Sequence, residues 1–156
     1  MHMNDAFGLT FRNGFLRDAQ FHFALALAPP VLLLMNGLTP AWSAGIQANL
    51  AIFFLLVIWQ PVIEEILFRG FIQGGLRRLQ WARVHLLGLS TANWTTTALF
   101  VGAHLVQHSF GWALAVAAPS LLFGHFRERH QHIYPAILLH AFYNACYLLL
   151  GHMNNG

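Results

Sequence analysis

The sequence predicts an all-α fold, a polytopic transmembrane helical bundle of about five membrane helices, and two observations support this prediction. Hydrophobic residues make up 57% of the 156 positions and charged residues only 8%, whereas soluble domains carry about 25% charged residues. We therefore expect most of the surface to contact lipid. In addition, five apolar stretches approach the roughly 20 residues that cross the hydrocarbon core as a helix. They lie at about residues 21–38, 46–63, 88–107, 110–126 and 133–151.

We interpret residues 1–156 as a single integral membrane domain, because the connections between the apolar stretches are short and rich in turn residues. Residues 1–45 are the N-terminal segment with the first span, and residues 46–151 are the remaining core. The segment 127–130 is predicted to be the connection before the last span.

Pro29-Pro30 lies within the first span and predicts a kinked or divided helix, because proline donates no helical hydrogen bond. Turn residues at 36–40 follow this span, without a small-residue cleavage pattern. We therefore expect a retained signal anchor and not a removable signal peptide.

The basic residues predict the orientation, because cytoplasmic connections carry an excess of Lys and Arg. All eight basic residues are arginines, and a cytoplasmic N-terminus places three groups of them on one side: the pair Arg12 and Arg17, the cluster Arg77, Arg78 and Arg83, and the pair Arg127 and Arg129. We expect an integral protein of a bacterial inner (plasma) membrane. The arginines are too few and too dispersed for a nucleic-acid surface.

Three charged residues at the end of the second apolar stretch are the first candidates for function. Charge inside a span costs several kcal/mol on insertion scales and persists mainly where it is paired inside the protein. Glu65 and Arg69 are four residues apart, so we expect them to form an ion pair on one helical face. Glu64 points about 100° away and has no evident partner in its own helix. A purely structural role in helix packing is the alternative, which the additional carboxylate of Glu64 disfavours.

Polar residues in two later spans can join this group. His104 lies in the third stretch, and His140 and Asn144 share one helical face in the last. A carboxylate and an imidazole can remove a proton from a shared water, while a second imidazole and an amide can donate hydrogen bonds to an oxyanion. These groups are the parts of a peptidase.

The spacing of these residues resembles the CAAX protease and bacteriocin-processing (CPBP, Abi) family of intramembrane glutamic endopeptidases. Over about residues 46–150 the chain carries its three motifs in order: EExxxR at Glu64, Glu65 and Arg69, FxxxH at Phe100 and His104, and HxxxN at His140 and Asn144. The resemblance implies a four-helix catalytic core inside the predicted bundle.

The resemblance also implies the roles of the residues. Glu64 with His104 would activate water, His140 with Asn144 would stabilise the oxyanion, and Glu65, Arg69 and Phe100 would support the site. We therefore expect no cofactor. The implied substrates are membrane-associated, lipidated or sorting-signal peptides. Neither the cleavage motif nor the oligomeric state can be read from the sequence.

The depth of the residues in the membrane constrains the third span. If that span began at His85, His104 would lie near the outer surface, away from Glu64 and His140. We therefore predict that residues 85–93 form an interfacial turn and that the membrane helix begins near Trp94.

Two other functions are open at this point. Glu64, His104 and His140 could ligate zinc in a membrane metallopeptidase, although the HExxH signature is absent. A non-catalytic immunity or partner-binding membrane protein could retain the helical core without using the motif residues. A transporter is disfavoured, because the chain has no inverted repeat. The remaining histidines near the arginine-rich connection, at 125, 130 and 132, are interpreted as interfacial.

Overall fold

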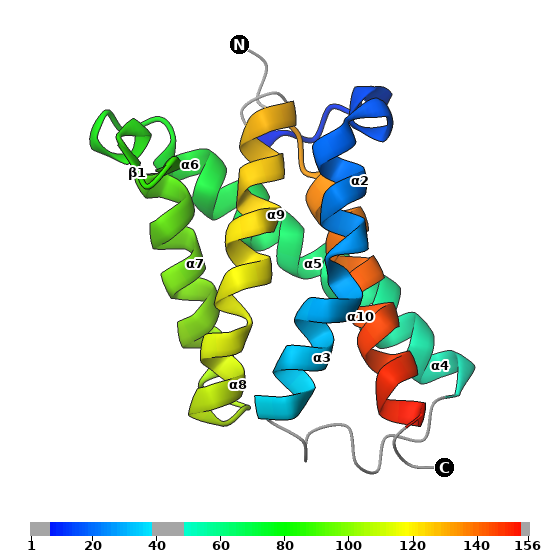
Figure 1. The fold of residues 1–156 in the computed structure, drawn as a ribbon. Coiled ribbons are helices and arrows are strands. Elements are labelled where there is room, and N and C mark those ends of the chain that lie inside the picture. Colours follow the sequence, from blue (N-terminus) through cyan, green and yellow to red (C-terminus); the bar gives the residue numbers. More distant parts are fainter. Residues whose placement is uncertain (1–6, 39–48, 154–156) are drawn as a thin grey trace.

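The computed structural model describes residues 7–38 and 49–153, and these residues form an α-helical bundle with one small β-hairpin (Figure 1). The predicted all-α fold class is confirmed. Residues 36–38 of the turn expected after the first span are helical, and residues 39 and 40 lie outside the described residues. The elements, in chain order, are η1 (Asn13–Arg17), α2 (Ala19–Ala26), α3 (Ala28–Leu38), α4 (Leu50–Phe53), η2 (Phe54–Trp59), α5 (Gln60–Glu65), η3 (Ile66–Gln73), α6 (Gly74–Leu76), η4 (Trp81–Arg83), β1 (His85–Leu86), β2 (Leu89–Ser90), α7 (Thr91–His104), α8 (Phe110–Ala115), α9 (Ala117–His130) and α10 (Tyr134–Met153).

The first apolar helix is divided next to Pro29-Pro30, as predicted. Helix α2 ends at Ala26 and α3 begins at Ala28, with Leu27 between them. The Asp18 side chain caps the N-terminus of α2 by accepting a 2.9 Å hydrogen bond from the Gln20 N–H. This bond satisfies one of the free donors at a helix N-terminus.

One continuous helix of 27 residues, Leu50–Leu76, carries both glutamates and contains the segments α4 to α6. Two of these segments, η2 and η3, are π-helical, a geometry in which the N–H bonds to the carbonyl five residues back. Among the described residues this is the one helix long and apolar enough to cross a membrane by length and composition. Ala19–Met35 and Tyr134–Leu150 form shorter apolar helices, and the count of five spans stays a prediction.

The segment before α7 is a tight hairpin. Strand β1 pairs antiparallel with β2, and the two turn residues between them, Leu87 and Gly88, have positive φ angles of 53° and 82°, as type I′ hairpin turns require. Helix α7 begins at Thr91 and not near Trp94, because the Ser90 side chain caps it by accepting from the Asn93 N–H at 3.0 Å. The prediction that this helix begins well after His85 is thus confirmed, although its first residue lies three positions before Trp94.

The fourth apolar stretch differs from the prediction in two ways. It is divided into α8 and α9 at Val116, because Pro119 has no N–H to continue the hydrogen bonding across the junction. Helix α9 then continues through His130, so the expected connection at 127–130 is wrong. Arg127 favours the helix here, because its buried side chain donates to the carbonyl of Arg69 at 3.2 Å. The interfacial placement of His132 is also wrong, since this residue is 1% exposed among aromatic rings.

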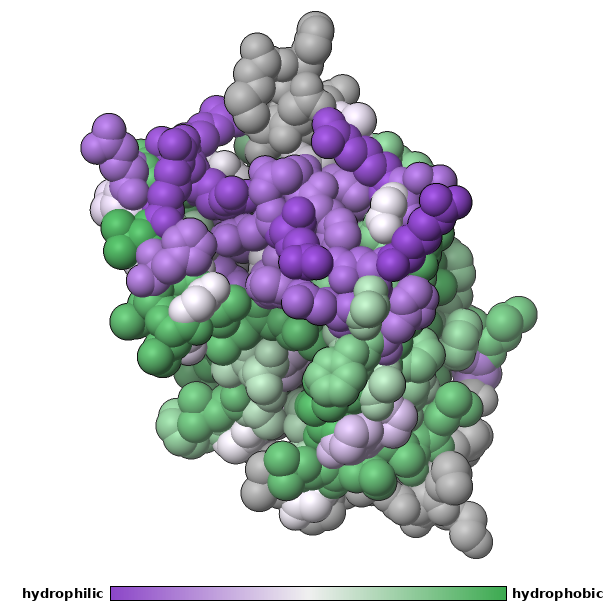
Figure 2. All heavy atoms as spheres, turned by 45° about the horizontal axis from the view of Figure 1, so that its top comes forward, coloured by the Kyte–Doolittle hydropathy of each residue, from purple (hydrophilic) through white to green (hydrophobic). Residues whose placement is uncertain are grey.

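Polar and apolar surfaces are segregated along the bundle. Figure 2 shows hydrophilic residues gathered at the end of the molecule that is uppermost in Figure 1, with hydrophobic residues over the rest of this face. Exposed arginines at positions 12, 17, 78, 83 and 129 come from segments at that end. Large exposed apolar side chains, including Leu34, Phe54 and Leu67, come from α3, η2 and η3. Below the polar end, α10 packs against α3, α9 and η2, and α7 packs against α9.

Candidate active site

A cavity of about 230 Å³ lies between the helices, and four of the candidate residues line it. Glu64 enters from α5, His104 from α7, and His140 and Asn144 from α10. Phe100 also lines the cavity, whereas Glu65 and Arg69 lie outside its lining and are fully buried. The structure therefore brings together residues that are up to 80 positions apart in sequence (Glu64 to Asn144).

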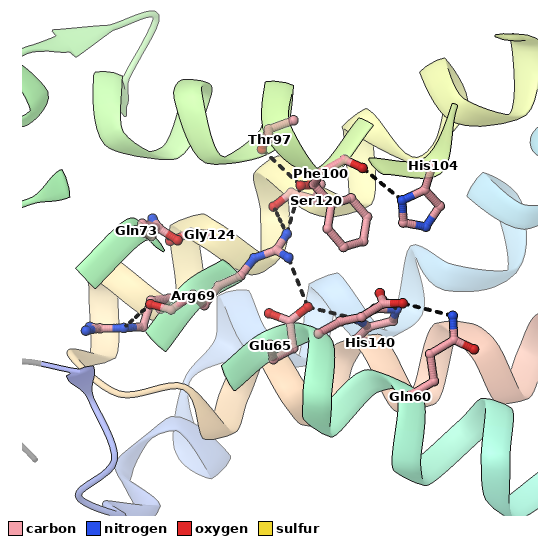
Figure 3. Close-up of polar contacts among 12 residues, drawn as sticks. Gln60, Glu65, Arg69, Gln73, Thr97, Phe100, His104, Ser120, Gly124 and His140 are labelled. Carbon is pink, nitrogen blue, oxygen red and sulfur yellow. Dashed lines mark hydrogen bonds and ion pairs between the residues drawn. The ribbon is translucent and has the colours of Figure 1, made fainter. Parts of the chain in front are cut away.

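Glu65 and Arg69 form the predicted ion pair, with 3.1 Å between Glu65 Oε1 and Arg69 Nη1. The guanidinium also donates to the Ser120 carbonyl at 3.0 Å and to Ser120 Oγ at 2.8 Å. Its central carbon lies 4.8 Å from the centre of the Phe100 ring, a distance typical of cation–π contacts. Figure 3 shows Arg69 reaching between Glu65 and Ser120. Buried charge is tolerated here because the pair is supported by further hydrogen bonds.

His140 lies between the two carboxylates. Its Nδ1 is 2.8 Å from Glu65 Oε1, and its Nε2 is 3.8 Å from Glu64 Oε2. Since a carboxylate only accepts, the Nδ1–H of His140 donates to Glu65, and this bond directs Nε2 toward Glu64. The imidazole also stacks on the ring of Phe123, with 5.0 Å between ring centres. The orientation of His140 is therefore set by the buried glutamate.

Glu64 does have a partner in its own helix, contrary to the expectation from sequence. Gln60, one helical turn earlier, donates from Nε2 to Glu64 Oε1 at 2.8 Å. The other oxygen, Oε2, is buried and has no hydrogen-bond partner among the described residues. The two oxygens of Glu64 are thus unequal: one is held by an amide, and the other remains available for a bound molecule.

His104 and Asn144 complete the wall of the cavity. His104 Nδ1 donates to the Phe100 carbonyl at 2.9 Å, so the neutral ring has its accepting nitrogen at Nε2. Asn144 Nδ2 donates to the Leu56 carbonyl at 2.8 Å. That carbonyl needs a donor from outside its helix, because the Gln60 N–H bonds to Leu55 and the residue five positions after Leu56 is Pro61, which has no N–H.

The sequence interpretation missed Gln60 and Ser120. The contact of Gln60 could have been predicted from the sequence, because a spacing of four residues places Gln60 and Glu64 on one helical face. The contact of Ser120 could not, because Ser120 is 51 residues from Arg69 and no local pattern connects the two. For the zinc alternative, the described residues contain no group of three His, Cys, Asp or Glu side chains arranged to hold a metal ion.

The fold and the motifs define a class, that of membrane endopeptidases, and comparison with known families defines the group within it. Residues 46–146 match the family described as type II CAAX prenyl endopeptidase Rce1-like. The protein belongs to this family, which is the CPBP (Abi) family that the three motifs resemble, and it is an integral membrane protein. No curated protein and no solved structure matches the chain.

Proposed function

We propose that this protein is an intramembrane endopeptidase in which Glu64 and His104 activate water for hydrolysis of a peptide bond, without a cofactor. The observation that carries the proposal is the inequality of the adjacent glutamates. Glu65 is fully buried against Arg69 and lies outside the cavity lining, whereas Glu64 lines the cavity and its Oε2 accepts no hydrogen bond among the described residues. Function is the expected reason for such an ionisable group in a membrane helix.

In the proposed reaction a water donates one hydrogen to Glu64 Oε2 and the other to His104 Nε2. The water oxygen bonds to the carbonyl carbon of the substrate as Glu64 takes the proton, and a tetrahedral oxyanion forms. The Nε2–H of His140, whose Nδ1–H is held by Glu65, and the amide of Asn144 donate to this oxyanion. The C–N bond then breaks, the proton passes from Glu64 to the leaving nitrogen, and an acid and an amine are released.

Glu65, Arg69 and Phe100 support the site without touching the substrate in this proposal. Glu65 holds the Nδ1–H of His140, Arg69 neutralises Glu65, and the Phe100 ring lies against Arg69. We propose substrates that reach the cavity from the bilayer, namely membrane-associated, lipidated or sorting-signal peptides. We further propose five spans and a cytoplasmic N-terminus in a bacterial inner membrane, in agreement with the arginine-rich end of the bundle.

The test is cleavage of a quenched library of membrane peptides by the purified protein in detergent, with and without a metal chelator. The proposal expects chelator-resistant cleavage, and Glu64→Gln should lower kcat roughly 100- to 10,000-fold, the usual contribution of a general base. Stoichiometric bound zinc with chelator-sensitive cleavage would assign Glu64, His104 and His140 to a metal site. Absence of cleavage across the library, or full activity of Glu64→Gln, would overturn the proposal.

A further inference from the structure

We propose that Gln60 is a positioning residue for the reaction: its amide holds one oxygen of Glu64 so that the other, Oε2, receives the proton of the attacking water. The inference rests on the proposed function and extends it to a residue outside the three family motifs. Gln60 lines the same cavity as Glu64, and its amide lies 2.8 Å from Glu64 Oε1. Figure 3 shows Gln60 reaching this contact from the helix that also carries Glu65.

The position of Gln60 is fixed by the backbone. Gln60 begins α5 at the end of the π-helical segment η2, and its N–H bonds five residues back to Leu55. The next carbonyl, that of Leu56, is held by Asn144 on α10. Asn144 therefore anchors the helix at the turn from which the Gln60 side chain departs. This contact links the last family motif to the geometry of Glu64.

The chemistry of the partner distinguishes Gln60 from Arg69. An arginine neutralises its carboxylate, as Arg69 does for Glu65, and a neutralised carboxylate is a poor base. A glutamine amide is a neutral donor, so it orients Glu64 and leaves the carboxylate with its full negative charge. Without this donor the carboxylate can rotate about its last bond, and neither oxygen is held in line with the cavity.

Directing one oxygen matters because proton transfer depends on geometry. A misplacement of about 1 Å in a reacting group costs on the order of 100-fold in rate. Glu64 Oε2 is the oxygen nearer His140 Nε2, at 3.8 Å. A substrate group held on this side of Glu64 lies between the proposed base, Glu64, and the proposed oxyanion donor, His140. Gln60 thus determines which side of Glu64 faces the substrate.

The experiment compares kcat, KM and the pH dependence of kcat for the wild-type protein and three variants in detergent. Gln60→Leu removes the donor and keeps the volume. Gln60→Glu keeps the shape, and its carboxyl group donates only when it is protonated. Gln80→Leu is the matched control, because it makes the same chemical change at an exposed glutamine outside the cavity lining. Thermal unfolding of each variant in the same detergent verifies that it is folded.

We expect Gln60→Leu to lower kcat roughly 10- to 100-fold at every pH, with KM within about threefold of the wild type. Gln60→Glu should be as slow at pH 8 and should recover kcat as the pH falls toward 5, because the introduced carboxylic acid regains its proton and donates to Glu64. Gln80→Leu should follow the pH profile of the wild type. A structural role for Gln60 alone would produce no recovery with pH.

Two results would overturn the inference: a kcat for Gln60→Leu equal to that of Gln80→Leu, or a Gln60→Glu profile that follows Gln60→Leu at every pH. Failure of the proposed function has a different signature, in which the Glu64→Gln protein cleaves as fast as the wild type. In that case the proposed positioning role of Gln60 would be overturned together with the proposed function.

Discussion

The two adjacent glutamates of one helix occupy opposite environments, although they differ by one position in sequence. Glu65 is 0% exposed and bonds to Arg69 and His140. Glu64 lies at the cavity wall and accepts from one amide donor, and its second oxygen, 3.8 Å from His140 Nε2, accepts no hydrogen bond among the described residues. Glu65 is structural, because its Oε1 holds a buried cation and an imidazole away from the cavity. Glu64 faces the cavity, so its Oε2 can accept from a substrate or a water.

The largest effect expected from this comparison is on stability. Glu65→Gln should lower the free energy of unfolding by about 3–5 kcal/mol, because Arg69 is left as a buried cation without its counter-ion. Glu64→Gln should change it by less than about 1 kcal/mol, because Arg69 keeps Glu65 as its counter-ion and the amide at position 64 can still accept from Gln60. Unfolding in mixed micelles with increasing sodium dodecyl sulfate measures both. Equal losses in the two variants would contradict the division into a structural and a reactive carboxylate.

The second prediction concerns the packing of α7 against α9 behind Arg69. The substitution changes neither carboxylate. A Cβ added at Gly124 on α9 would lie 2.0 Å from Asn93 Oδ1 on α7, and Asn93 is held in place by its bond to the Leu121 carbonyl. Gly124→Ala should therefore separate α7 from α9 and cost about 3 kcal/mol. The same unfolding assay measures the loss, and cleavage should fall as well because α7 carries His104.

The control for Gly124 is a glycine on the facing helix, α7. Gly102 has no described atom within 4 Å of an added Cβ, so Gly102→Ala should leave stability unchanged or raise it slightly. A loss in Gly102→Ala as large as that in Gly124→Ala would show that the close approach of the two helices is not the cause.

A smaller effect is expected from the hydroxyl that supports Arg69. Ser120→Ala removes one of the two bonds from Arg69 to Ser120 and leaves the carbonyl contact, so it should cost about 2 kcal/mol. Thr97→Val should cost less, about 1 kcal/mol, because Thr97 contacts Ser120 Oγ and not the cation. If Thr97→Val proved the more damaging variant, the hydroxyl would serve the α7–α9 contact more than Arg69.

The last effect concerns the polar end of the bundle, away from both glutamates, and it is measured only when the pH is changed. Burial, with the nearby His130 and Arg127 adding to it, lowers the pKa of His132 from 6.5 to about 4. Between these values the unfolded chain binds more protons than the folded chain, so stability falls as the pH is lowered from about 6.5 toward 4. Unfolding midpoints at pH 7.5 and pH 5 should differ less in His132→Gln than in the wild type. If the difference between the two midpoints is the same in His132→Gln as in the wild type, another group causes the pH dependence of stability.

Much of the fold followed from local patterns. The division of the first helix came from two prolines, and the late start of α7 came from the depth that His104 must occupy. The prediction failed at α9, because the side chain of Arg127 bonds to a carbonyl 58 residues away and its charge had suggested a connection. His132 was misplaced for a similar reason, since a histidine surrounded by distant aromatic rings has no local signature of burial.

The sequence by itself determined the all-α class, the Glu65–Arg69 pair and the order of the motif residues, because each depends on composition or on the helical period. Only the tertiary structure decided which glutamate lines the cavity and which is buried between Arg69 and His140. Ser120 and His140 reach the site from 51 and 75 residues away, and the cavity beside Glu64 exists only when α5, α7 and α10 have packed. A helical repeat specifies neighbours within one or two turns, whereas contacts between helices depend on the packing of whole faces.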